Sequence, residues 1–133
     1  MQNIYTPAIR VFVVASLFIA TATLMVVAVN TARAAGALAI GSCGAFGEAF
    51  DFASVEEATQ SALSKCQGDR CRVVATSKRG CAAFAVDFSD PCGAHGWGKG
   101  ARLGRSQNAA LEACYKGGGK ECVIRTFFCD AKG

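Results

Sequence analysis

The sequence predicts an α+β domain, in which a small antiparallel sheet carries two helices on one face and disulfides staple the chain. Three observations predict it: eight cysteines in 133 residues, several apolar or β-branched runs of strand length, and two Ala-rich runs of helical length that end on a cysteine. The cysteines fall into two copies of one pattern, which begin at Cys43-Gly44-Ala45 and Cys92-Gly93-Ala94. We therefore expect repeat units of about residues 36–83 and 84–131, related by a pseudo-twofold axis.

Residues 1–34 are expected to be a signal peptide. A start with one positive charge, Arg10, precedes an apolar run over residues 11–29, and the small-x-small triplet Ala32-Arg33-Ala34 follows. These are the parts of a cleavable secretory signal, so we expect one mature domain, residues 35–133, that is secreted or periplasmic and leaves the membrane after cleavage. The apolar run is also long enough to cross a bilayer, so an uncleaved anchor is the alternative.

The first unit is expected to begin with two short strands, over residues 36–40 and 46–52, that a tight Gly-rich turn joins. Ser54-Val55-Glu56-Glu57 then has the form of a capping box. In such a box the Ser hydroxyl accepts a hydrogen bond from a free N–H of the first helical turn. This motif predicts a helix over about residues 55–66.

Two β-rich runs follow, over residues 71–77 and 81–88, and the polar Ser77-Lys78-Arg79-Gly80 between them predicts a hairpin. The rest of the chain is expected to form a Gly-dense loop or irregular strand, a second helix and a final strand, over residues 89–100, 103–115 and 121–129.

Composition and spacing argue against several classes of function. The net charge of +4 falls to +2 when Arg10 and Arg33 leave with the signal, which is too small to indicate nucleic-acid binding. No C-x-x-C occurs and Cys92-Gly93-Ala94-His95 is the only Cys-x-x-His, so no metal site is expected. The alternating glycines of residues 96–100 lack a strand-turn-helix phosphate fingerprint, and no cofactor is expected.

The even number of cysteines indicates structural disulfides in an oxidising compartment. Eight cysteines allow 105 pairings, and sequence alone does not choose among them. The repeat restricts the choice to two pairs that tie a helix end to the next strand and two that join equivalent cysteines of the copies: Cys66 with Cys71, Cys114 with Cys122, Cys43 with Cys92, and Cys81 with Cys129. By chain entropy, a bridge across six residues stabilises by about 2 kcal/mol and one across fifty residues by about 4 kcal/mol.

The candidate binding residues lie around the alternating glycines and are His95, Trp97, Lys99 and Arg102. His95 is the only histidine, and Trp97 is the only tryptophan and would offer a stacking surface on a loop that a partner can approach closely. The alternative is an ordinary strand, because the two residues stand where Phe46 and Glu48 stand in the first copy. No recognisable nucleophile or orienting acid accompanies His95, so an enzyme is not expected.

A second candidate surface is basic and is expected around the predicted hairpin, at Arg70, Arg72, Lys78 and Arg79. These side chains could meet an acidic surface. The alternative is a solvated face, which is the commoner fate of such charges.

The order of short motifs carries a family resemblance. Gly36-Ala37-Leu38-Ala39 opens it, and Ala-Leu-x-x-Cys, Cys-x-Val-Val, Cys-Ala-Ala, a Gly-rich segment and a late cysteine follow. In this order the chain resembles the bacterial secreted domain-of-unknown-function family 4189 over nearly all of residues 35–133. The resemblance implies an exported bacterial protein, often of one domain, with no established catalytic residues.

Together these observations predict an exported, non-enzymatic binding module with an unknown protein or envelope partner. A secreted inhibitor or an immunity-type protein is the sharpest form of that hypothesis. The alternatives are a small secreted hydrolase that uses His95 and a structural component of the envelope.

Overall fold

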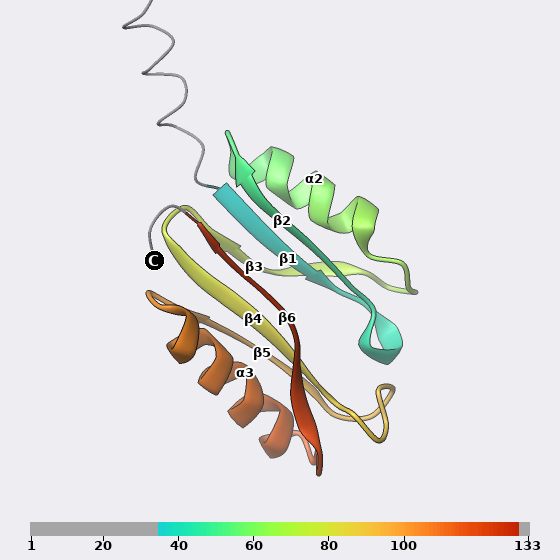
Figure 1. Cartoon of the computed structure of the whole chain (residues 1–133). Coiled ribbons are helices and arrows are strands. Elements are labelled where there is room, and N and C mark those ends of the chain that lie inside the picture. The colour runs from blue at the N-terminus through green and yellow to red at the C-terminus, as the bar shows by residue number, and fades with distance from the viewer. Residues whose placement is uncertain (1–34, 131–133) are drawn as a thin grey trace, which may run out of the picture. The chain divides into compact units, whose positions relative to one another are not determined.

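The computed structural model describes residues 35–130, which form six strands, two α-helices and one 3-10 turn (Figure 1). In chain order these are β1 (Ala35–Ile40), η1 (Ser42–Gly44), β2 (Phe46–Phe52), α2 (Val55–Lys65), β3 (Arg72–Ser77), β4 (Gly80–Asp87), β5 (His95–Gly100), α3 (Leu103–Lys116) and β6 (Cys122–Asp130). The α+β class and the antiparallel pairing are confirmed. The expected signal peptide, residues 1–34, lies outside the described residues.

The strands form two sheets, not the single sheet expected, with strand orders β2-β1-β3 and β5-β4-β6. The hairpin predicted at residues 77–80 is therefore wrong, because β3 and β4 belong to different sheets. The physical reason is that β4 is apolar and buried on both faces, so it takes the centre of a sheet with β5 and β6 as its neighbours. Each sheet has the connectivity strand, strand, helix, strand, while the pseudo-twofold axis stays a prediction.

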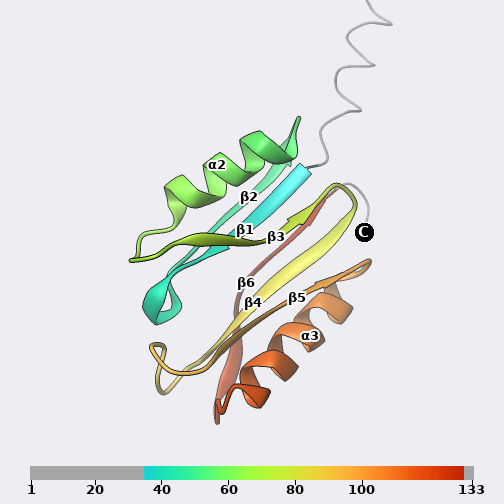
Figure 2. The same ribbon diagram turned by 180° about the vertical axis from the view of Figure 1, so that it is seen from behind.

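The two sheets pack face to face and the helices cover the two outer faces (Figures 1 and 2). The expectation of two helices on one face is therefore wrong. On the central strand β1, Ala37 and Ala39 face α2, while Leu38 and Ile40 face the other sheet, as the two-residue period of a strand requires. The core between the sheets consists of Leu38, Ile40, Ala75, Ala82, Phe84, Val86 and Phe128.

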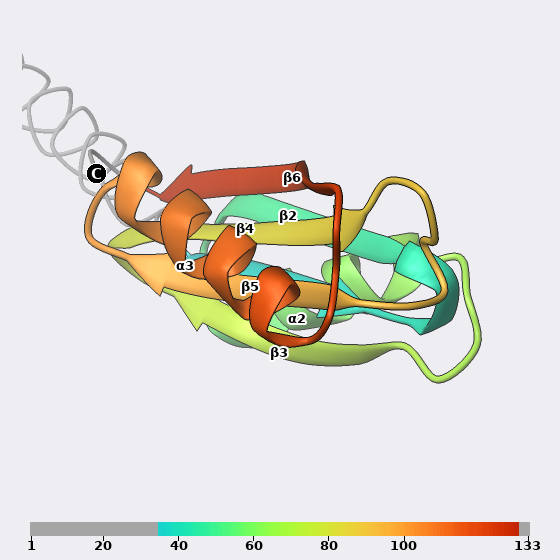
Figure 3. The ribbon, with the colours of Figure 1, turned by 90° about the horizontal axis from the view of Figure 1, so that it is seen from below.

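Small residues let each helix lie directly on its sheet. A Cβ built on Gly47 of β2 would stand 2.7 Å from the backbone nitrogen of Cys66, where α2 ends. A Cβ on Gly96 or Gly98 of β5 would lie 2.4 Å from Cys114 N or 2.6 Å from Ser106 O, both in α3. The alternating glycines are therefore the floor on which α3 rests, and Figure 3 shows α3 lying along β5 and β4.

Four disulfides join the pairs that the sequence analysis expected. Two tie the end of a helix to the strand after it, Cys66–Cys71 and Cys114–Cys122. Cys81–Cys129 links the neighbouring strands β4 and β6 at directly paired positions, so it lies within the second sheet, and the expectation that this pair joins the two copies is wrong. Cys43–Cys92 links η1 to the loop between β4 and β5 and so joins the two sheets covalently.

Candidate functional site

A hollow of about 410 Å³ opens at the rim of the sandwich where β3 and β5 lie side by side, and we call it the β3/β5 hollow. Its floor is the end of β1 and the start of η1, at Ile40, Gly41 and Ser42. Its walls are Arg70 and Arg72 on one side and His95 on the other. Two chain segments that are far apart in the sequence therefore place basic side chains around one space, and a third segment supplies its floor.

A short covalent loop holds Arg70 and leads directly into Arg72 at the start of β3. Cys66–Cys71 closes the connection between α2 and β3, and Arg70 lies within it with a left-handed φ of 55°. The backbone N–H and the hydroxyl of Ser42 both donate to the Asp69 carbonyl oxygen, at 3.0 and 2.9 Å, and fix the same loop against η1. A non-glycine residue in this conformation costs roughly 1–3 kcal/mol. The surrounding bonds therefore hold Arg70 in a conformation that a free loop would seldom adopt.

His95 reaches the hollow because it opens β5 on the inner face of its sheet. It pairs with Val86 of β4, whose side chain belongs to the core between the sheets. The centre of its ring lies 6.1 Å from the centre of the Phe84 ring. The imidazole is exposed, so one end of it contacts the core and the other faces solvent.

The charge around the hollow is of one sign. No carboxylate lines it, and the three side chains that can carry charge are all basic. Within the described part of the chain the one ion pair joins Lys116 to Glu112 on α3, so neither arginine is neutralised by a salt bridge there. A concave surface with unneutralised guanidinium groups attracts anions.

The expected binding residues separate into two groups. His95, Trp97 and Lys99 alternate along β5 and share its inner face, opposite the glycines. The strand alternative is therefore right for these positions, and the loop is confined to the residues before His95. Trp97 is 40% exposed and lies one strand period along β5 from His95, but it does not line the hollow itself. Arg102 precedes α3 at the other end of β5, away from the hollow.

The expected basic group also divides. Arg70 and Arg72 lie at the start of β3 and line the hollow. Lys78 and Arg79 are exposed in the connection after β3, at the opposite end of that strand. The surface expected around one hairpin is therefore two separate surfaces.

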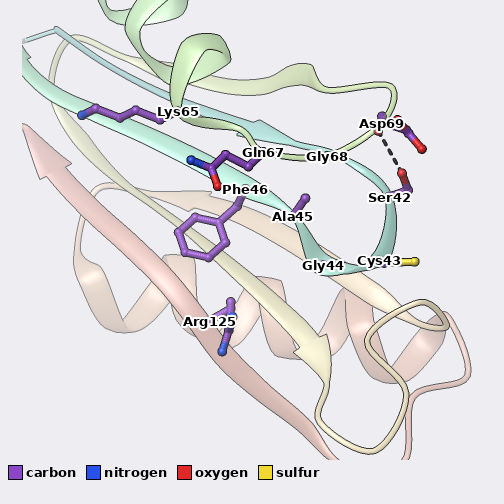
Figure 4. Close-up of a pocket in the computed structure, with 10 residues that line it drawn as sticks. All are labelled: Ser42, Cys43, Gly44, Ala45, Phe46, Lys65, Gln67, Gly68, Asp69 and Arg125. Atoms are coloured by element: carbon purple, nitrogen blue, oxygen red, sulfur yellow. Dashed lines mark hydrogen bonds between the residues drawn. The ribbon is translucent and has the colours of Figure 1, made fainter.

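A second and larger hollow, of about 570 Å³, lies on the other side of η1, against β2 and β6 (Figure 4). Its cations are already engaged: the Lys65 ammonium donates to the Glu48 carbonyl oxygen at 3.0 Å, and the Arg125 guanidinium lies 5.9 Å from the centre of the Phe46 ring. Asp69 lines it as well. An anion would compete with existing contacts here, so the β3/β5 hollow is the better candidate site.

Two buried carboxyl groups lie outside both hollows. The Asp87 carboxylate accepts hydrogen bonds from the Lys120 N–H and from the N–H and hydroxyl of Ser89, and these bonds lower its pKa to about 2. Burial raises the pKa of Asp130 to about 6, and neither of its oxygens has a hydrogen-bond partner among the described residues. Both residues end strands of the second sheet, so they bear on stability, not on the hollow.

Other kinds of site find no support in residues 35–130. No three His, Cys, Asp or Glu side chains in this range lie close enough together to hold a metal ion. Neither helix within it is long and apolar enough to span a bilayer.

Comparison with known proteins places the chain in a family. The family model described as a domain of unknown function, DUF4189, matches residues 35–129. The chain belongs to the DUF4189 family. Rv1813c from Mycobacterium tuberculosis, solved by NMR, has a similar structure, with a TM-score of 0.55 and 26% sequence identity over 73% of this chain and 75% of that one. No curated protein matches significantly.

The floor of the hollow in this DUF4189 domain was not singled out from the sequence. In the sequence this segment, Ile40 to Ser42, has only the pattern of a strand end followed by a turn. One signal was available at the walls: Arg70 and Arg72 flank Cys71, so a disulfide that holds the cysteine also positions both of its neighbours. How close these two arginines come to His95 depends on how the two sheets pack, and no local sequence pattern predicts that packing.

Proposed function

We propose that this DUF4189 domain is an exported, non-enzymatic binding module, and that it holds an envelope or extracellular partner at the β3/β5 hollow. The observation that carries the proposal is the lining of the hollow by Arg70, Arg72 and His95 with no carboxylate. Four disulfides indicate an oxidising compartment, which is consistent with export.

Rigidity supports a binding role. Arg70 is fixed by the Cys66–Cys71 loop, Arg72 by its pairing with Ile40 of β1, and His95 by its pairing with β4. Side chains on such elements lose less conformational freedom when a partner binds, so less of the interaction energy is spent on ordering them. Trp97 adds a half-exposed aromatic surface on the same strand as His95. Arginine and tryptophan together are typical of residues that dominate binding interfaces.

The alternative function, a hydrolase that uses His95, has one observation in its favour, since Ser42 lines the same hollow. A serine nucleophile needs its hydroxyl directed at a base, and the Ser42 hydroxyl instead donates to the Asp69 carbonyl oxygen. No hydrogen bond among the described residues joins His95 to a carboxylate that could orient it. These contacts favour binding over catalysis.

The test is capture of an envelope partner by matched variants. Disulfide-intact protein is immobilised as wild type, Arg72→Gln, Trp97→Ala and Arg79→Gln, and each is incubated with the native envelope fraction. Arg79→Gln removes the same charge as Arg72→Gln, but at the opposite end of β3. We expect a species retained by wild type and Arg79→Gln and lost from the other two. Equal retention by all four, with unchanged circular dichroism, would place the binding surface elsewhere.

A further inference from the structure

We propose that the β3/β5 hollow recognises a phosphate ester, with the phosphate between the arginines and His95 and its organic group directed toward Trp97. This inference rests on the proposed binding function and names the chemistry of the ligand. It follows from the geometry of the donors, from the size of the hollow and from the side chains beside it.

The donors lie on two sides of the space. Arg70 and Arg72 come from the first sheet and its entry loop, and His95 comes from the second sheet. A planar carboxylate is satisfied by the fork of one guanidinium group, which would leave the donors opposite without an acceptor. A phosphate presents oxygens in several directions and can accept from both sides at once. Arginine is also the side chain best suited to bind phosphate with two parallel hydrogen bonds.

The size of the hollow argues for an ester instead of a free ion. Its volume of about 410 Å³ falls in the range of roughly 300–1,000 Å³ that is typical of sites for organic ligands, and inorganic phosphate would fill little of it. Trp97 lies two residues along β5 from His95, on the same inner face and 40% exposed, just outside the residues that line the hollow. An organic group attached to the phosphate would therefore meet an apolar surface as it leaves the basic walls.

The first measurement is affinity for glycerol 3-phosphate, by NMR titration of the disulfide-intact exported protein at constant ionic strength. We expect saturable shifts of the Arg70, Arg72 and His95 signals. Hydrogen bonds to a charged group are strong enough that Arg72→Gln should weaken binding by about tenfold or more. His95→Gln should weaken it as well, while Arg79→Gln should leave it unchanged. Circular dichroism and a non-reducing gel confirm that each variant is folded.

Further probes distinguish a lipid phosphate from a soluble one, and a failure of the phosphate inference from a failure of the proposed function. Vesicles of phosphatidylglycerol in phosphatidylcholine test a lipid headgroup: binding that Arg72→Gln abolishes supports the proposal with a lipid source, and binding to glycerol 3-phosphate alone supports it with a soluble one. Poly-L-glutamate tests a carboxylate ligand. If it binds at the hollow and glycerol 3-phosphate does not, the phosphate inference is overturned while the proposed function stands. If no probe binds, or Arg79→Gln weakens binding as much as Arg72→Gln, the phosphate inference is overturned, and the capture of an envelope partner decides the proposed function separately.

Discussion

Replacing Asp130 with Asn should make this domain more stable at neutral pH. The Asp130 side chain is fully buried at the end of β6, and its oxygens have no hydrogen-bond partner among the described residues. It lies against β1, since a Cβ on Gly36 would stand 2.4 Å from one of its oxygens. Burial raises the pKa of Asp130 to about 6, and the negative charge of Asp51 adds to that rise; the peptide N–H of Asp51 lies near enough to oppose it but outside hydrogen-bond geometry.

The direction of the pH dependence follows from the raised pKa. The ordinary pKa is 3.8 and the folded value is about 6, so the folded state prefers the protonated acid. The free energy of unfolding is highest, as far as Asp130 is concerned, below pH 4, where the acid is protonated in both states. This advantage is lost as the pH rises through 6. The difference of about 2 between the folded and the ordinary pKa corresponds to about 3 kcal/mol of unfolding free energy. The effective penalty of a buried charge falls as the protein relaxes and water penetrates around it, so we expect about 1–3 kcal/mol.

Urea unfolding of disulfide-intact protein at pH values from 4 to 8 measures this contribution. Wild type should lose stability as the pH rises from 4 to 7, and Asp130→Asn should flatten that slope and raise the midpoint above that of wild type at pH 7.5. Asp69→Asn is the matched control, because Asp69 is exposed and its carboxylate makes no described hydrogen bond. If Asp130→Asn were less stable than wild type by the same amount at every pH, the reasoning would be refuted.

Two further substitutions test the helix contact and the other buried acid. Gly98→Ala should destabilise the domain by about 1–3 kcal/mol, because the new Cβ would lie 2.6 Å from the Ser106 carbonyl oxygen. Gly104→Ala is the control: a Cβ there meets open space, so the change should be neutral or stabilising by up to about 1 kcal/mol. Equal urea midpoints for the two variants would contradict the close contact at Gly98. The pKa of Asp87 is lowered to about 2, chiefly by the Lys120 N–H, so its stabilisation is present above pH 4 and is lost as the pH falls to 2. Asp87→Asn should therefore make acid unfolding between pH 4 and 2 shallower, and an unchanged acid transition by circular dichroism would count against that role.

The local elements could be predicted because their causes are local. Ser54 accepts a hydrogen bond from the Glu57 N–H at 3.2 Å, as the capping motif implies, and α2 begins at Val55. The second helix likewise begins at the expected Leu103 and ends one residue beyond the expected Tyr115. Caps, helical periodicity and the β-branched runs need only a few neighbouring residues, so they can be recognised without knowledge of the fold.

The stacking of two sheets could not be predicted in the same way, because it depends on contacts between distant residues. Leu38 and Phe84 meet in the core although they lie in different sheets. One clue was present, since β4 carries alanines on one face and the larger Phe84 and Val86 on the other. A strand that is apolar on both faces is central and covered twice. The alternating glycines of β5 carried a second clue, since glycine at every other residue leaves one strand face bare for a helix.

The candidate site was predictable in its residues and not in its assembly. The sequence indicates His95 and Trp97 as one candidate surface and Arg70 and Arg72 as another. Arg70, Arg72 and His95 line one hollow only because β3 and β5 come together when the sheets stack, and Trp97 follows His95 along β5. Arg102 is near His95 in the sequence, which predicts one group, but the length of β5 separates them.

Peptide mapping of the exported protein under non-reducing conditions tests the central claim most directly, because the four bridges fix both the sandwich and the loop that positions the arginines. We predict a mature chain that begins at Ala35, no free thiol, and linked peptides for Cys43–Cys92, Cys66–Cys71, Cys81–Cys129 and Cys114–Cys122. Several alkylatable thiols, or a Cys43 linked to any partner other than Cys92, would contradict the account.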